Sequence, residues 1–134
     1  MRPSIRQDVP KAAVAACLIA LGVAGPVGVR TGLAQGVPRS YDASPEVYRV
    51  LASRGQTRVL MITWAPGQSD RMHSHGPTAG YFLTDCSLRF RFPDGRVVEA
   101  QRKAGTAFIQ DPIEAHAVQN TGDAECRIVM AENE

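Results

Sequence analysis

The sequence predicts an all-β domain that folds as a sandwich or a small barrel. Short runs of β-branched and large apolar residues recur about every 8 to 12 residues, with turn-forming residues between them. Residues 87–92 alternate apolar and polar side chains, which is typical of a strand with one buried face. No stretch after the first 34 residues keeps a helical period of 3.6 residues over an adequate length.

The length and composition indicate one globular domain. The chain has 134 residues, of which 44% are hydrophobic. The formal net charge of +2 does not describe the domain, because four of the fifteen basic residues lie in the first 34 positions. The remainder carries eleven basic and twelve acidic residues, so no basic patch indicates binding to nucleic acid.

Residues 1–34 have the pattern of a secretory signal peptide. Three basic residues, Arg2, Arg6 and Lys11, precede an uncharged apolar run over residues 12–25, which is short for a membrane span. Small residues at positions 32 and 34 place the expected cleavage after Ala34. We therefore expect a periplasmic or secreted protein with no membrane contact after cleavage. The alternative is an uncleaved N-terminal anchor.

Export would change the interpretation of the cysteines. Cys17 would leave with the signal peptide, whereas Cys86 and Cys126 would remain in a compartment where disulfides persist. The two residues either form a bridge or are two small buried hydrophobic side chains. The residues alone favour neither alternative.

The mature chain is expected to begin with a tether, residues 35–46, and to continue as the β domain, residues 47–134. The first half of the domain contains four expected strands, which are separated by turn signals such as Pro66-Gly67. These strands are expected over residues 47–51, 58–64, 71–75 and 80–84.

Five further strands complete the expected domain. In the clearest of them Leu88, Phe90 and Phe92 share one face, and polar side chains occupy the other. The next turn is Pro-Asp-Gly, in which Gly95 can take a positive φ. The expected strands are residues 87–92, 96–102, 106–110, 115–119 and 126–131.

The chain contains three histidines, and two of them are two residues apart. On a strand, His73 and His75 project from the same face. His116 lies in a second apolar segment that can fold back over the first. Imidazoles in this arrangement indicate a metal site, although an isolated H-x-H is also found as two polar side chains on a surface strand.

The sequence resembles the cupin family, because six residues fall at the spacings of its two motifs. The first motif begins G-x5-H-x-H, and the second places a histidine and an asparagine after a glycine. The resemblance covers about residues 47–132 and implies a single-domain jelly-roll barrel. The matching residues are Gly67, His73, His75, Gly105, His116 and Asn120.

The chain departs from the first motif at its glutamate, because Thr78, Ala79 and Gly80 are the candidate positions and none is a carboxylate. The resemblance then implies a three-histidine site for a divalent transition metal, one of Fe, Mn, Zn, Ni or Cu, with positions open to water or substrate. Asp111 either accepts an imidazole N–H or is a solvated turn residue. Asn120 either supports the site or forms a turn.

The resemblance also has implications for the cysteines and for assembly. In a jelly roll the strand that begins at Cys126 lies antiparallel beside the strand that ends near Cys86, which implies a bridge between the two. Small cupins often form dimers, and residues 47–51 are a candidate for pairing between two copies of the chain.

Two functions remain open from the sequence. The first is an exported, metal-dependent, dioxygenase-like oxidoreductase that acts on a small organic substrate, with the metal held by His73, His75 and His116. The second is a non-catalytic periplasmic module that binds a metal or a small ligand, including a cupin that holds an organic ligand without metal. An acidic or basic side chain beside the metal would favour the enzyme over the binding module. The sequence identifies no such catalytic residue.

Overall fold

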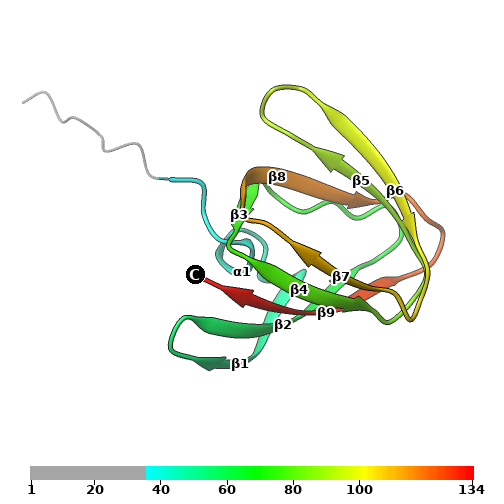
Figure 1. The fold of residues 1–134 in the computed structure, drawn as a ribbon. Coiled ribbons are helices and arrows are strands. Elements are labelled where there is room, and N and C mark those ends of the chain that lie inside the picture. The colour runs from blue at the N-terminus through cyan, green and yellow to red at the C-terminus, as the bar shows by residue number, and fades with distance from the viewer. Residues whose placement is uncertain (1–35) are drawn as a thin grey trace, which may run out of the picture. The chain divides into compact units, whose positions relative to one another are not determined.

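The computed structural model describes residues 36–134, which form a β domain. The described strands lie in two antiparallel sheets that pack as a sandwich (Figure 1), which confirms the predicted all-β class. The expected signal peptide lies outside the described residues, so its cleavage and the export of the protein stay predictions. Within residues 36–134 no helix is long and apolar enough to cross a membrane.

The nine strands of the described part lie where the sequence predicted them. The bounds differ by a few residues, and the last strand continues to Asn133 instead of ending at residue 131. This extension brings Glu132 into the strand. The elements are α1 (Ser40–Ala43), β1 (Tyr48–Arg54), β2 (Thr57–Trp64), β3 (His73–His75), β4 (Thr78–Phe82), β5 (Cys86–Arg91), β6 (Val97–Arg102), β7 (Ala107–Gln110), β8 (Ile113–Asn120) and β9 (Cys126–Asn133).

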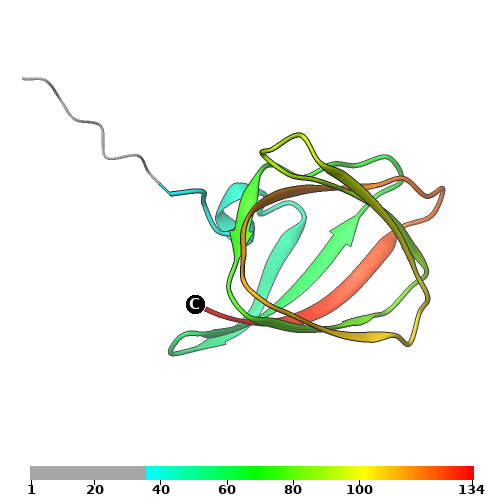
Figure 2. The same ribbon diagram turned by 45° about the horizontal axis from the view of Figure 1, so that its top comes forward.

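The two sheets curve around a common interior (Figure 2). The first sheet has five strands in the order β1-β2-β9-β4-β7, and the second has four in the order β3-β8-β5-β6. The strand β1 is therefore an edge of the first sheet. Dimer formation through residues 47–51, which lie largely in β1, stays a prediction.

Apolar side chains from both sheets fill the interior. On β2, Leu60, Ile62 and Trp64 alternate with more exposed residues and are at most 3% exposed. From the other sheet, Leu88 of β5 and Val118 of β8 belong to the same core. The period of two residues in a strand thus gives each sheet one buried face.

The strand β9 directs four alternating side chains inward, and the last of them is a carboxylate. Cys126, Ile128 and Met130 are apolar and buried. Glu132 follows in the same series with only 1% of its surface exposed. Because burial of a carboxylate is costly without partners, this position indicates a local polar cluster inside an apolar barrel.

A disulfide joins the two sheets at one end of the domain. It links Cys86, the first residue of β5, to Cys126, the first residue of β9. The strand that precedes Cys86 is paired antiparallel with β9, with Phe82 opposite Ile128. The bridge implied by the resemblance is therefore present, and it closes a loop with a sequence separation of 40.

The segment expected to be a tether contains α1 and packs against β3. Ser44 is fully buried, and its hydroxyl oxygen accepts the Arg71 N–H at 2.9 Å. On the other side, the Ser74 N–H donates to the Pro38 carbonyl at 2.9 Å. These two hydrogen bonds flank His73 in the sequence, so the segment helps to fix the strand that carries this histidine.

The disulfide predicts a measurable loss of stability when both cysteines are replaced. A Cys86→Ser/Cys126→Ser variant should unfold with a free energy about 2–4 kcal/mol lower than oxidised wild type, because the unfolded chain gains the freedom of an open loop. Urea denaturation of the two proteins measures this difference. Reduced wild type is the control and should match the variant. Two free thiols in the oxidised, unfolded mature protein, which lacks Cys17, would contradict the prediction.

Candidate metal centre

The structure brings all three histidines together at one end of the barrel interior. His73 and His75 are on β3, and His116 is on β8, where it is the direct antiparallel partner of His73. All three are buried, with 0%, 6% and 3% of their surfaces exposed. One ring nitrogen of each lies within 4.8 Å of those of the other two. We call this group the three-histidine site.

The ring of His73 is oriented by the backbone. Its Nδ1 lies 2.7 Å from the Arg71 carbonyl oxygen, which can only accept a hydrogen bond, so Nδ1 carries the hydrogen. Its Nε2 is then left with a free lone pair that faces the other rings. Burial, followed by the neighbouring His75, lowers the pKa of His73 to about 4, so the ring is neutral at pH 7.

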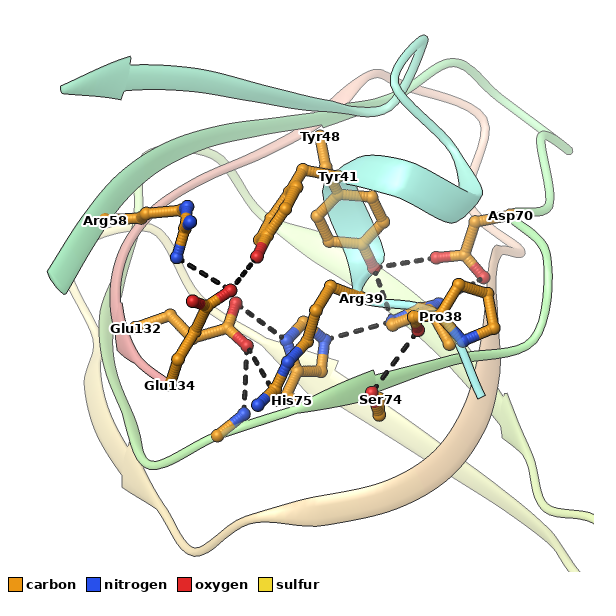
Figure 3. A network of polar contacts seen from close by, with 12 residues as sticks. Pro38, Arg39, Tyr41, Tyr48, Arg58, Asp70, Ser74, His75, Glu132 and Glu134 are labelled. Atoms are coloured by element: carbon orange, nitrogen blue, oxygen red, sulfur yellow. Dashed lines mark hydrogen bonds and ion pairs between the residues drawn. The ribbon is translucent and has the colours of Figure 1, made fainter. Parts of the chain in front are cut away.

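The ring of His75 is oriented by the buried carboxylate of β9. Its Nδ1 lies 3.2 Å from Oε2 of Glu132, and its Nε2 lies 3.0 Å from Nε2 of His73 (Figure 3). The other carboxylate oxygen of Glu132 accepts the Gly76 N–H at 2.9 Å and is 3.8 Å from the Arg39 guanidinium. Glu132 therefore holds His75 from behind, as an outer carboxylate often holds a metal-binding histidine.

His116 is the histidine without polar partners. Both of its ring nitrogens are buried, and neither has a hydrogen-bond partner in the structure. The ring stacks on Phe90, with a distance of 5.8 Å between the ring centroids. Burial and then the nearby His73 and His75 lower the pKa of His116 to about 2, which keeps it neutral. Such unpaired buried nitrogens are rare, and they indicate a missing partner at this place.

These donors fit a divalent transition metal. Neutral imidazole nitrogens suit Zn, Fe, Cu and Ni, and bonds of about 2.0–2.1 Å place adjacent ligands about 3 Å apart. The separation of 3.0 Å between the Nε2 atoms of His73 and His75 agrees with this spacing. Without a cation, the two lone pairs would face each other at close range. The site could therefore hold a metal through these three residues.

A second buried carboxylate lies on the other side of the site. Asp70 Oδ1 accepts the Val118 N–H at 2.6 Å, and Oδ2 accepts the Tyr48 hydroxyl at 2.8 Å and the Trp64 indole N–H at 3.2 Å. Burial raises the pKa of Asp70 to about 6, because it outweighs these hydrogen bonds. The Tyr48 hydroxyl oxygen also lies 3.1 Å from Nε2 of His73.

Glu132, Asp70 and Tyr48 are not among the site residues predicted from the sequence. A signal was available for Glu132, which continues the alternation of inward residues along β9. The two other side chains meet across elements, and no local pattern indicates their contact.

Asp111 is exposed between β7 and β8, which agrees with a solvated turn.

Asn120 is buried and holds a turn. Its amide nitrogen donates to carbonyls of Trp64, Ala65 and Ala124, and its oxygen accepts the Gly122 N–H at 3.0 Å. Of the two interpretations left open for Asn120, the structure therefore supports its role in forming a turn.

A cavity of about 220 Å³ lies next to the three-histidine site. His75 and His116 form part of its wall, and the rest is mostly apolar. Thr78, at one of the candidate positions for the absent motif glutamate, also lines the cavity, and its buried hydroxyl oxygen has no hydrogen-bond partner. Glu132 and Asp70 are not among the lining residues, so both carboxylates lie behind the histidines.

The sequence profile of the cupin domain family matches residues 60–132. The chain therefore belongs to the cupin domain family, as the two motifs predicted. No curated protein sequence matches the chain.

Solved structures of cupin domains share the fold. A cupin domain from Bordetella pertussis Tohama I is 21% identical with a TM-score of 0.60, and the match covers 75% of this chain and 98% of that one. A protein with a double-stranded β-helix domain from Klebsiella pneumoniae is 20% identical with a TM-score of 0.52, covering 65% and 75% of the two chains. At these identities the likeness shows the fold and leaves the activity open.

The low pKa of His116 predicts that the metal-free protein loses stability in acid. Between pH 6.5 and 2 the unfolded chain binds a proton at this residue and the folded protein does not, so the free energy of unfolding falls as the pH falls. From pH 7.5 to 5.0 the loss from His116 should be about 2 kcal/mol. Urea denaturation in EDTA of wild type and His116→Gln at both pH values measures it.

The comparison isolates His116 from the other titrating groups. Asp70 acts in the opposite direction, because its raised pKa favours the folded state as the pH falls through about 6, but it is present in both proteins. The variant should therefore lose less stability than wild type between the two pH values. Equal losses in the two proteins would contradict the prediction.

Proposed function

We propose that this protein binds a divalent transition metal through His73, His75 and His116. The observation that supports this most strongly is the convergence of three buried imidazoles on one place. His116 adds to it, because its buried nitrogens have no other partner. Fe, Mn, Zn, Ni and Cu are the candidate metals, and imidazole donors suit Fe, Zn, Ni and Cu best among them.

Three histidine ligands would leave coordination positions open, as in catalytic metal sites. The cavity beside His75 and His116 is where a ligand could reach such positions. Its volume of about 220 Å³ is below the roughly 300–1,000 Å³ typical of sites for drug-sized ligands. We therefore propose a small organic ligand or substrate with an apolar body.

The leading proposal for activity is a metal-dependent, dioxygenase-like oxidoreductase. A bound metal would polarise the substrate and, if it is redox-active, activate oxygen. The residues of the chain would hold the metal, exclude water with the apolar cavity wall and position the substrate, with the free hydroxyl of Thr78 as a hydrogen-bonding group. Glu132 and Asp70 lie behind the histidines and would orient ligands instead of exchanging protons with a substrate.

The second candidate is a non-catalytic module that binds a metal or small ligand. It is favoured by the same placement of Glu132 and Asp70, since neither carboxylate lines the cavity where an acid or base would act on a ligand. For both candidates we propose a periplasmic or secreted location. The pattern of residues 1–34 and the disulfide between Cys86 and Cys126 support it.

Elemental analysis of protein purified from its native compartment without a histidine tag tests the metal proposal. Wild type should contain close to one transition-metal ion per chain, and His75→Ala should contain almost none, because the remaining two imidazoles bind weakly. Metal-loaded protein that consumes oxygen with a small organic substrate would support the enzyme over the binding module. Wild type that stays metal-free even after reconstitution would contradict the proposal.

Replacing Glu132 should lower the metal affinity, although Glu132 itself would not contact the metal. In Glu132→Gln the amide can still accept the Gly76 N–H, but the charge that polarises His75 is removed. We expect the affinity to fall about 10–100-fold, as for other outer carboxylates. Competition with a chelator measures it. Glu125→Gln, an exposed residue before β9, is the matched control and should bind as wild type does.

A further inference from the structure

Tyr48 lies beside the three-histidine site, and no motif predicts it. It is the first residue of β1, is 2% exposed and lines the same cavity as His75 and His116. Its ring lies edge-on to the ring of His73, with 5.0 Å between the centroids, and 5.9 Å from the ring of His75. A polar hydroxyl is thus held inside the aromatic and imidazole cluster.

The hydrogen bonds around Tyr48 place its hydroxyl oxygen next to the lone pair of His73 Nε2. The hydroxyl has one hydrogen, and the Asp70 carboxylate at 2.8 Å accepts it (Figure 3). Asp70 also accepts N–H groups from Trp64 and Val118, so it acts as an acceptor for all its neighbours. His73 Nε2, at 3.1 Å from the Tyr48 oxygen, has no hydrogen to offer, because Nδ1 carries it.

The lone pair of His73 Nε2 therefore has two close neighbours. Nε2 of His73 is 3.0 Å from Nε2 of His75 and 3.1 Å from the Tyr48 oxygen. Two ligands at right angles on one metal, with bonds of about 2.0–2.2 Å, are about 3 Å apart. Both separations from His73 Nε2 are close to this value. A cation bound at His73 Nε2 would convert these close repulsive contacts into bonds.

We propose that the hydroxyl oxygen of Tyr48 is a fourth protein ligand of the metal in the three-histidine site. This inference rests on the proposed function, because it needs a metal at the three histidines. Tyr48 then takes the role of the oxygen ligand that is absent at Thr78, Ala79 and Gly80. On coordination the O–H bond would break with its electron pair left on the oxygen, and the proton would pass to Asp70 Oδ2, which already accepts that hydrogen.

Loading with Cu(II) tests the proposal, because this ion binds imidazole sites tightly and gives a visible charge-transfer band with a tyrosine oxygen. We expect the band in wild type and its loss in Tyr48→Phe. We also expect the affinity for Cu(II), measured by competition with a chelator, to fall at least about 10-fold. Tyr81→Phe is the matched control, because Tyr81 is 44% exposed on β4, and it should keep both properties.

The outcomes separate this inference from the proposed function. Equal affinities of wild type and Tyr48→Phe, with no charge-transfer band in wild type, would overturn the role of Tyr48 and leave the three-histidine site intact. Absence of Cu(II) binding by wild type would overturn both. If Tyr48→Phe fails to fold, resonance Raman spectra of Cu(II)-loaded wild type and Tyr81→Phe decide. Tyrosine ring vibrations enhanced in both support the proposal, and their absence in wild type overturns it.

Discussion

The pairing of β3 with β8 is the contact on which the rest of the site depends. It places His116 directly opposite His73, and the two-residue period of β3 adds His75 on the same face. A shift of the register by one residue would turn His116 toward the opposite face of the sheet. The packing of residues 38–44 against β3 and the apolar core between the sheets therefore support the site as well as the fold.

Polar groups on the side of the histidines away from the cavity offset the energetic cost of burying the imidazoles. The Arg71 carbonyl lies at hydrogen-bonding distance from Nδ1 of His73, and the Glu132 carboxylate lies at that distance from Nδ1 of His75. The other nitrogen of each ring is left free to face the centre of the site. Asp70 is satisfied by three donors from three different segments. Among the residues that line the cavity, His116 and Thr78 carry buried polar atoms without partners. This distribution separates a structural polar layer from a surface available to a metal and a ligand.

The sequence predicted what depends on local patterns. Alternation and turn residues located the strands, and the spacing of the histidines located the three-histidine site. The disulfide was implied by the resemblance to the cupin family and not by the cysteines alone. Glu132 was missed because the last strand was predicted to end one residue before it, so its place in the inward series went unused. Tyr48 and Asp70 were missed for another reason. Their contact joins β1 to the loop before β3, and only the packing of the sheets brings these segments together.

The central claim is that the three histidines hold one metal ion, and anomalous diffraction locates a metal directly. Crystals of metal-loaded protein, measured on both sides of the absorption edge of that metal, should show one strong peak inside the barrel. We expect this peak about 2.0–2.2 Å from one ring nitrogen of each of His73, His75 and His116. A peak only at surface carboxylates, with the three imidazoles free of metal, would contradict it.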